Sequence, residues 1–397
     1  MSSQHISKGF IFLMAAVVGV MAANLYYAQP IISFIASSLG IRADAAGLIL
    51  TMTQVGYGLG VLFVVPLGDL VENRRIIFIM MGVTILAELC LGFASHVVPY
   101  FVASLLVGIG ASTLQIVVPY VSHLSEPSQR GSVLGTLMSG MMMGIMLSRP
   151  LSSLLTDLIS FHAVFFVSAT LMLLLLWKIF SVLPERRPEN HGLHYGQLIL
   201  SMKSLVVNTP TLRRRGFYQA CLFGAFCLFW TTVPMMLMES QFHFSQKAVA
   251  IFALAGVAGA VVAPLAGKMA DRGWSKRLTV LSSVVAVLSF FISFLIQPGS
   301  LFSLVMLLIA ANLLDAGVAS HLVLGQRAIF SIDPKNQGRL NGLYIAMIYV
   351  GGASGSALGA WAYAHGGWQS AAIAGLCFPV FGLLVMATEP VLKYKEI

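Results

Sequence analysis

Long, continuously apolar runs separated by short polar segments make up most of the chain. One helix needs about 20 apolar residues to cross a bilayer. The pattern predicts twelve membrane-spanning helices, at residues 9–29, 45–66, 75–95, 98–121, 131–155, 163–183, 216–238, 247–267, 277–297, 300–324, 340–362 and 368–388. The runs do not alternate apolar and polar residues at a period of two, so the pattern argues against a membrane β-barrel.

The composition supports a chain that lives in lipid. Charged residues make up 9% of the 397 residues, and the mean hydropathy is +0.89, whereas soluble domains carry roughly 25% charged residues. So few charges cannot cover a water-facing surface of this size. Because a segment in lipid must satisfy its own backbone polar groups, we predict an all-α integral membrane protein.

The basic residues are distributed unevenly between the two sides of the predicted membrane. With twelve spans both termini share a side. That side would carry Lys8, Arg74, Arg75, Arg130, Lys178, Arg186, Arg187, Lys203, Arg213, Arg214, Arg215, Lys268, Arg272, Lys276, Arg277, Arg327, Lys335, Arg339, Lys393 and Lys395. The opposite side would carry Arg42 and Lys247. Since cytoplasmic loops are enriched in Lys and Arg, we predict that both termini are cytoplasmic.

The net charge of +9 follows from this asymmetry and requires no nucleic-acid partner. A basic cytoplasmic surface will attract anionic lipid. The sequence therefore points to the bilayer as a partner.

The chain reads as two similar halves. The long polar connection at 184–215 separates a predicted six-helix bundle at 1–183 from a second one at 216–397. Gly68-x3-Glu72 in the first half recurs as Gly267-x3-Asp271 in the second. Internal repeats of this kind are typical of transporters that move two bundles about a central site. We therefore expect two bundles of six helices related by an internal repeat.

Both repeated stretches, PLGDLVENRR (66–75) and PLAGKMADRGWSKR (264–277), are short cytoplasmic turns rich in charge. Glycine permits a sharp turn or a close approach of helices, an acid suits a helix start, and basic side chains can bond carboxylates and carbonyl groups at helix ends. We predict a cytoplasmic gate at Gly68, Asp69, Glu72, Arg74, Arg75, Gly267, Asp271, Arg272, Lys276 and Arg277. The alternative is that these charges only anchor the loops on the cytoplasmic side.

These two stretches resemble the cytoplasmic loop motif of the major facilitator superfamily, G-x3-D-R-x-G-R-R. The second copy fits well, whereas the first is shorter and has Glu72-Asn73 where Asp-Arg is usual. The resemblance implies a twelve-helix transporter in which this motif stabilises the outward-facing state. It says nothing about the substrate.

A series of glycines begins the fifth predicted span. Gly131-x8-Gly140-x3-Gly144 resembles the antiporter motif of the superfamily's drug:proton exporters, except that Ile145 stands where proline is usual. The resemblance favours export, and the alternative is ordinary helix packing through small residues. In the fourth span, Ser104, Val107 and Gly108 occupy places where related exporters often carry an arginine and a Gln-Gly pair. A proton relay must therefore be built differently here.

Two acids lie inside predicted spans. A charge at the bilayer centre costs about 2.5–3.5 kcal/mol, so such residues are functional candidates. Asp315 lies near the middle of the tenth span and Glu88 in the middle of the third. Both are candidates for proton coupling, Asp315 the leading one, and the alternative for each is a structural hydrogen bond to a neighbouring helix.

Other polar or polarisable side chains within the spans could line a substrate cavity. Amides, phenols and methionines together suit amphipathic organic molecules. The candidates are Asn24, Tyr27, Gln115, Met142, Met146, Arg149, Asn312, Asn341 and Tyr344. For each of them the alternative is a bond between helices; Arg149 could hold an anionic group or pair with Asp157, Glu239 or Asp315.

The chain contains no G-x4-G-K-S/T nucleotide motif and neither H-E-x-x-H nor G-x-S-x-G, so no site for ATP or for hydrolysis is visible. We therefore predict a non-enzymatic secondary transporter of the bacterial inner membrane. It would act as a monomer, need no cofactor and export a small organic or amphipathic compound in exchange for protons. Proton-linked uptake of a metabolite is the alternative within transport. A non-transporting membrane sensor is the alternative from another class, but it would lack a polar cavity and usually carries a soluble domain.

Overall fold

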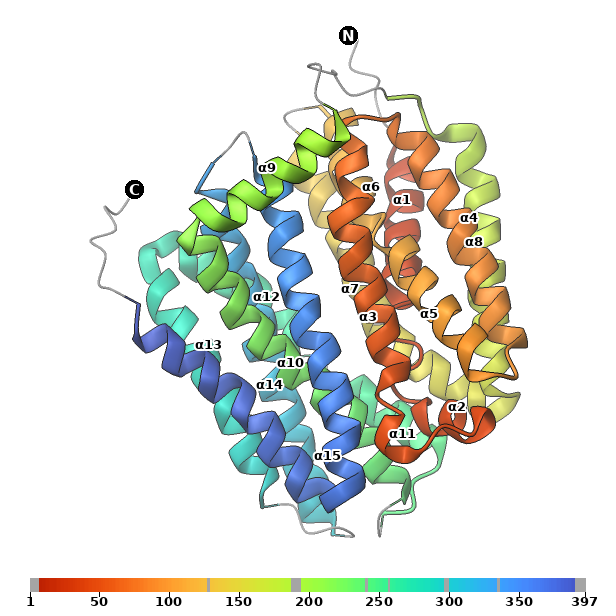
Figure 1. Cartoon of the computed structure of the whole chain (residues 1–397), viewed down its shortest axis with the longest axis vertical. Helices are drawn as coiled ribbons and strands as arrows, with labels where there is room; N and C mark the ends of the chain where they lie inside the picture. Colours follow the sequence, from red (N-terminus) through yellow and green to blue (C-terminus); the bar gives the residue numbers. More distant parts are fainter. Residues whose placement is uncertain are drawn as a thin grey trace. The chain divides into compact units, whose positions relative to one another are not determined.

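In a computed structural model of the chain, the structure describes residues 7–126, 129–186, 194–239, 242–255, 258–295, 300–333 and 336–389. Every secondary-structure element within these ranges is a helix (Figure 1), as the apolar runs predict. Four of the basic residues counted for orientation, Arg187, Lys335, Lys393 and Lys395, lie outside the described residues. The sidedness of the chain stays a prediction.

The chain forms two compact units. One contains residues up to Ile41 together with Met52–Lys203, and the other contains Arg42–Thr51 and the residues from Ser204 onward. Residues 42–51 therefore cluster with the second unit, although the division made from the sequence puts them in the first half. Thr51 shows why, because its Oγ1 donates to the carbonyl of Ala353 at 3.0 Å. Neither the predicted domain boundaries nor the internal repeat is tested by this clustering.

The first unit is built mainly from helices that follow one another along the chain. Its elements are α1 (Lys8–Ala23), α2 (Ile32–Leu39), most of α3 (Leu48–Phe63), η2 (Val65–Asp69), α4 (Asn73–Phe93), α5 (Val97–Ala111), α6 (Leu114–Leu124), α7 (Arg130–Leu158) and α8 (Phe161–Val182). Helix α9 (Tyr195–Asn208) begins here and continues into the second unit. Helices α4 and α8 run side by side (Figure 1).

The second unit contains the longer helices. Its elements are η1 (Ala43–Ala45), α10 (Pro210–Glu239), α11 (Gln246–Ala255), α12 (Ala258–Met269), η3 (Ala270–Trp274), α13 (Ser275–Ser293), α14 (Leu301–Phe330) and α15 (Gln337–Ala387). Helix α10 packs against both α14 and α15. Most residues of α10 are buried, which suits an apolar helix at the centre of its unit.

Within the described residues, nine helical segments are long and apolar enough to cross a membrane. Helix α1 has 16 residues and falls below that length. Residues Val261–Ser293 and Gln337–Ala387 each form one segment where two spans are predicted. Gly366 and Gly367 interrupt the helical geometry of the latter. The prediction of helices is confirmed, and the count of twelve stays a prediction.

Many large apolar side chains face outward. Phe93 is 77% exposed, Trp177 74% and Leu301 77%. A soluble monomer rarely exposes so much apolar surface, so these side chains are suited to contact with lipid.

Two predicted spans of the first unit are interrupted. Helix α1 ends at Ala23, and residues 24–31 form turns before α2 begins. Helices α5 and α6 are separated at Ser112 and Thr113, both fully buried. Irregular backbone at membrane depth is tolerated where protein surrounds it. The first interruption places the polar side chains of the segment NLYYAQP inside the unit.

Candidate functional site

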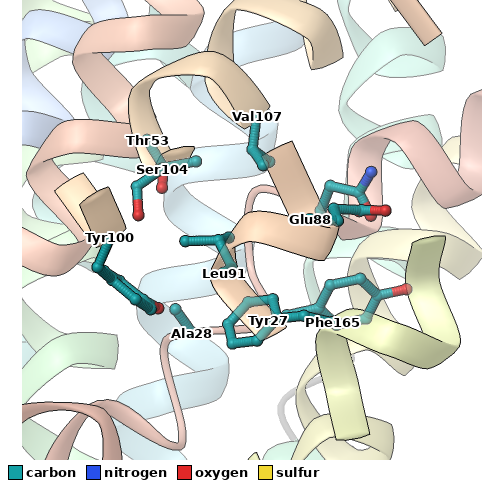
Figure 2. Close-up of a pocket in the computed structure, with 10 residues that line it drawn as sticks. Tyr27, Ala28, Thr53, Glu88, Leu91, Tyr100, Ser104, Val107 and Phe165 are labelled. Carbon is teal, nitrogen blue, oxygen red and sulfur yellow. The ribbon is translucent and has the colours of Figure 1, made fainter. Parts of the chain in front are cut away.

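A small polar pocket lies inside the first unit, next to the end of α1. Its polar lining includes Asn24, Tyr27, Glu88, Tyr100 and Ser104. Its apolar lining comes from α4, α5 and α8 and from Ala28 in the segment after α1 (Figure 2). The break after α1 directs Asn24 and Tyr27 to this place, and Glu88 reaches it from the middle of α4. The pocket therefore brings together three of the residues predicted as functional.

One serine hydroxyl joins two of these groups. Ser168 Oγ, on α8, lies 2.7 Å from Glu88 Oε1 and 2.8 Å from Asn24 Oδ1. A hydroxyl donates one hydrogen bond, an amide oxygen can only accept, and an ionised carboxylate can only accept. With the Asn24 amide oriented as it is, both contacts are satisfied if Glu88 is protonated and donates to Ser168, which in turn donates to Asn24 Oδ1. With an ionised Glu88, the Asn24 amide has to be turned to donate its NH2 group.

The surroundings of Glu88 offer little compensation for a negative charge. The side chain is 1% exposed, and its Oε2 has no hydrogen-bond partner among the described residues. No ion pair of Glu88 occurs in the part of the chain that the structure describes. An isolated buried charge is costly, so a buried acid takes up a proton instead. The geometry therefore favours a protonated Glu88.

The pocket is too small for an organic molecule. Its cavity volume is about 10 Å³, which is room for at most one water molecule. In this conformation the site around Glu88 can hold a proton or a water molecule but not a drug-sized compound.

Asp315 lies on α14 in the second unit and is 8% exposed. Its Oδ1 accepts a hydrogen bond of 2.9 Å from Trp230 Nε1 on α10. The Trp230 ring lies 6.1 Å from that of Phe252 and 6.5 Å from that of Phe226, centroid to centroid. Asn312, predicted to share a face with Asp315, donates to the carbonyl of Leu308 in its own helix at 2.9 Å. Asp315 therefore lies beside an aromatic cluster, a setting that can hold an organic cation.

Arg149 is 4% exposed in α7. Its Nε donates to Gln29 Oε1 at 2.9 Å, and its guanidinium lies 5.5 Å from the centroid of the Tyr26 ring. The segment after α1 thus supplies an amide and an aromatic face to a buried arginine. These contacts tie α7 to that segment.

The remaining cavity candidates occupy separate places. Gln115 Nε2 donates to the Tyr57 hydroxyl at 3.0 Å, and Asn341 Oδ1 accepts from Gln326 Nε2 at 3.3 Å. Met142 and Met146 are half-buried on α7. Tyr344 is fully buried on α15.

The first predicted gate stretch is held by contacts to helix ends. Arg74 Nη2 donates to the carbonyl of Phe180 near the end of α8 at 3.1 Å, and its guanidinium lies 5.3 Å from the Phe78 ring centroid. Asn73 Nδ2 donates to the Gly68 carbonyl at 2.8 Å. Glu72 is the N-cap residue of α4. Asn73, where the superfamily motif has arginine, therefore closes this turn.

The second gate stretch has a different local structure. Asp271 pairs with Arg327 on α14, and the Arg277 guanidinium lies 5.7 Å from the Trp274 ring centroid. In this stretch the left-handed backbone conformation occurs at Gly273, with φ +85°, and not at Gly267. A Cβ added at Gly267 would lie 3.7 Å from Val323, an ordinary van der Waals distance. The other gate candidates are exposed: Asp69, Arg75, Arg272 and Lys276.

Two of the three packing glycines bring α7 against α1. A Cβ added at Gly140 would lie 2.4 Å from the Ala15 oxygen, and one at Gly144 would lie 2.0 Å from the Gly19 oxygen. Gly131 has nothing within 4 Å of such a Cβ. The close approach predicted from the motif therefore involves Gly140 and Gly144, and the structure does not place Gly131 in it.

Sequence reasoning missed several buried polar groups, among them Ser168 and Tyr100 beside Glu88. It also did not select His321 as a functional candidate, although this residue is fully buried and contacts Gln219. Serines are common in membrane helices, so nothing in the sequence distinguishes Ser168. For His321 a signal existed, because an ionisable residue inside a span is a functional candidate by default.

Long apolar helices that enclose buried acids, amides and an arginine define a multi-pass membrane protein of the transporter class. The sequence model of the Major Facilitator Superfamily matches residues 11–324, and the chain belongs to this family. It is therefore a membrane transporter and not an enzyme.

Similar proteins support this assignment. The chain is 34% identical over 383 residues, 96% of both chains, to the Uncharacterized transporter YgaY of Escherichia coli O157:H7. It is 29% identical over 383 residues, 96% of this chain and 87% of the relative, to the Probable transporter SCO4007 of Streptomyces coelicolor. Its fold is similar, with a TM-score of 0.75 at 14% identity, to a bacterial homologue of the human lysosomal transporter Spinster, over 95% of this chain and 96% of the other.

Proposed function

We propose that the protein exports a small organic or amphipathic compound in exchange for protons, and that Glu88 carries the proton. The observation behind this is the Ser168 hydroxyl, which lies within hydrogen-bond distance of Glu88 Oε1 and Asn24 Oδ1. With the Asn24 amide oriented in this way, both groups accept when Glu88 is ionised. A proton on Glu88 turns one acceptor into a donor, and both contacts are then satisfied.

Release of the proton requires a change around Glu88. Water that reached Oε2 would solvate the carboxylate and remove the penalty of burying a charge. In alternating access, a site opens to one side of the membrane at a time. We infer that opening of the pocket to water accompanies proton release, and that closing requires Glu88 to be protonated again.

Two features support export rather than uptake. The Gly140 and Gly144 spacing resembles the antiporter motif, and both glycines contact the backbone of α1 directly. Asp315 beside Trp230 offers a carboxylate and aromatic surface to an amphipathic cation. We further propose that the transporter acts as a monomer in a bacterial inner membrane with both termini cytoplasmic.

The decisive experiment uses purified protein in liposomes that contain a pH-sensitive dye. Amphipathic cations, anions and neutral metabolites are added one at a time to the wild type, Glu88→Gln and Asp315→Asn. Glutamine resembles a permanently protonated Glu88, since its amide donates to Ser168. We expect substrate-dependent proton movement in the wild type, none in Glu88→Gln, and a change in substrate affinity in Asp315→Asn with proton movement retained.

A measurement without substrate checks the protonation itself. Infrared spectroscopy of the wild type at neutral pH should show the C=O band of a protonated carboxyl group, and this band should be absent in Glu88→Gln. If the band is unchanged in Glu88→Gln, or if proton movement persists in that variant, proton coupling belongs to another acid. Proton movement that persists in Glu88→Gln but is lost in Asp315→Asn would identify Asp315 as that acid.

A further inference from the structure

A second buried polar cluster lies in the second unit, apart from Asp315. His321 on α14, Gln219 on α10 and Tyr344 on α15 are each fully buried. His321 Nδ1 lies 2.6 Å from Gln219 Oε1. Three helices thus each contribute one polar side chain to the interior of this unit, and burial of polar groups is favourable only where they are hydrogen-bonded.

The hydrogen bonds define which nitrogen of His321 carries the proton. Gln219 Nε2 donates to the carbonyl of Val318 at 3.2 Å, so the amide oxygen of Gln219 faces the imidazole. An amide oxygen accepts, and Nδ1 must therefore be the protonated nitrogen. In the neutral ring Nε2 is then a bare acceptor.

That acceptor is not satisfied. His321 Nε2 is buried and has no hydrogen-bond partner within the described ranges. Protonation of Nε2 would replace an unsatisfied acceptor with an unsatisfied donor and would add a charge inside the membrane. A bound group that donates an N–H or O–H bond would satisfy Nε2 without that cost.

Tyr344 supplies a second unsatisfied group close by. Its hydroxyl, which also has no partner among the residues described, lies 2.0 Å from the place of a Cβ on Gly325. Gly325 follows His321 by four residues on α14, so the two positions are neighbours on one face, about 6 Å apart. The Tyr344 hydroxyl therefore lies beside the turn of α14 that follows His321.

We propose that His321 Nε2 and the Tyr344 hydroxyl form a subsite that binds an N–H or O–H group of the transported molecule. The imidazole accepts from that group, and the phenol can donate or accept. The subsite therefore selects amines with at least one N–H and alcohols over their fully alkylated analogues. This inference rests on the proposed transport function and adds a chemical requirement on the substrate.

Two substitutions separate the two nitrogens of His321. In His321→Asn the amide lies where Nδ1 was, so it can still donate to Gln219, but nothing replaces Nε2. In His321→Gln the longer side chain places its oxygen near the position of Nε2 and loses the Nδ1 donor. A purely structural histidine would tolerate asparagine, and a substrate-binding Nε2 would tolerate glutamine.

The probes are two cationic xanthene dyes, both ethyl esters. Rhodamine 6G has N–H groups, and tetramethylrhodamine ethyl ester is fully alkylated at nitrogen. Their affinities are measured by fluorescence polarisation with full-length protein in lipid nanodiscs. A dye without an N–H group loses one neutral hydrogen bond and leaves the buried Nε2 unsatisfied, which together weaken binding about tenfold. We therefore expect the wild type to bind rhodamine 6G about tenfold more tightly than tetramethylrhodamine ethyl ester. His321→Asn should bind both dyes alike, and His321→Gln should keep most of the preference.

Nitrogen NMR of histidine-labelled protein checks the tautomer without any dye. One histidine, absent in His321→Asn, should show a protonated Nδ1 and a bare Nε2. The subsite is refuted if Nε2 is protonated or already hydrogen-bonded to water, if His321→Asn keeps the tenfold preference, or if folded wild type binds neither dye. The Glu88 infrared band is recorded in the same samples. If the band is present, only the subsite has failed; if it is absent, the proposed protonation of Glu88 has failed as well.

Discussion

The contact between α1 and α7 gives a sharp test of the packing described here. At Gly144 the backbone of α1 lies so close that an added Cβ would be 2.0 Å from the Gly19 oxygen and 2.7 Å from its Cα. Ordinary contact begins at 3.4 Å. Backbone atoms cannot rotate away, so Gly144→Ala requires the two helices to separate locally by more than 1 Å.

The cost follows from two opposing terms. Overpacking of a close contact costs about 1–3 kcal/mol, and alanine in a helix is favoured over glycine by about 1 kcal/mol. With three backbone atoms in the way we place the overpacking at about 3 kcal/mol. The net loss of unfolding free energy is then about 2 kcal/mol, or a fall in Tm of about 2–3 °C for a chain of this length.

The assay is thermal unfolding of purified protein in detergent, followed by tryptophan fluorescence. Gly135→Ala is the matched control, because it lies in the same helix and has nothing within 4 Å of the added Cβ. The control should leave Tm unchanged or raise it slightly. If Gly144→Ala is as stable as Gly135→Ala, the close approach of α1 and α7 is wrong.

Three further predictions use the same measurement of Tm. Gly325→Ala should destabilise the protein by about 1–3 kcal/mol, because its Cβ would lie 2.0 Å from the buried Tyr344 hydroxyl. Adding Tyr344→Phe to this variant should restore part of the lost stability, and a double variant that recovers none would contradict the clash. Arg149→Lys should cost about 1–3 kcal/mol, because lysine cannot keep the bond to Gln29 and the contact with Tyr26 together; a neutral effect would contradict those contacts. Arg327→Ala should change stability by less than about 1 kcal/mol and less still in high salt, because its pair with Asp271 is solvent-exposed; a large loss would mean that the pair is buried in the membrane-embedded protein.

Most of the helical structure could be predicted from the sequence, because apolar length and the need to satisfy backbone groups in lipid are local properties. The positions where the helices end were less predictable. The span predicted at 9–29 stops at Ala23, and the residues that follow are held by contacts to other helices. Such an interruption depends on tertiary partners, so a hydropathy pattern passes over it.

The candidate site was predictable in part. Glu88, Asn24 and Tyr27 could each be named because polar groups inside a span are rare. Their meeting at Ser168, which lies 80 residues from Glu88 in the chain, could not be foreseen. In the same way the spacing of Gly140 and Gly144 indicated a close contact, but α1 as the partner comes from the fold.

The sequence by itself determined that the chain is helical, crosses a membrane and belongs with transporters, because these properties follow from composition, run length and short motifs. The tertiary structure decided which polar groups share a hydrogen bond and which are left without one. The proton proposed for Glu88 and the bare Nε2 inferred for His321 both follow from partners on other helices. Hydrogen bonding depends on distance in space, and no local pattern in the sequence contains that distance.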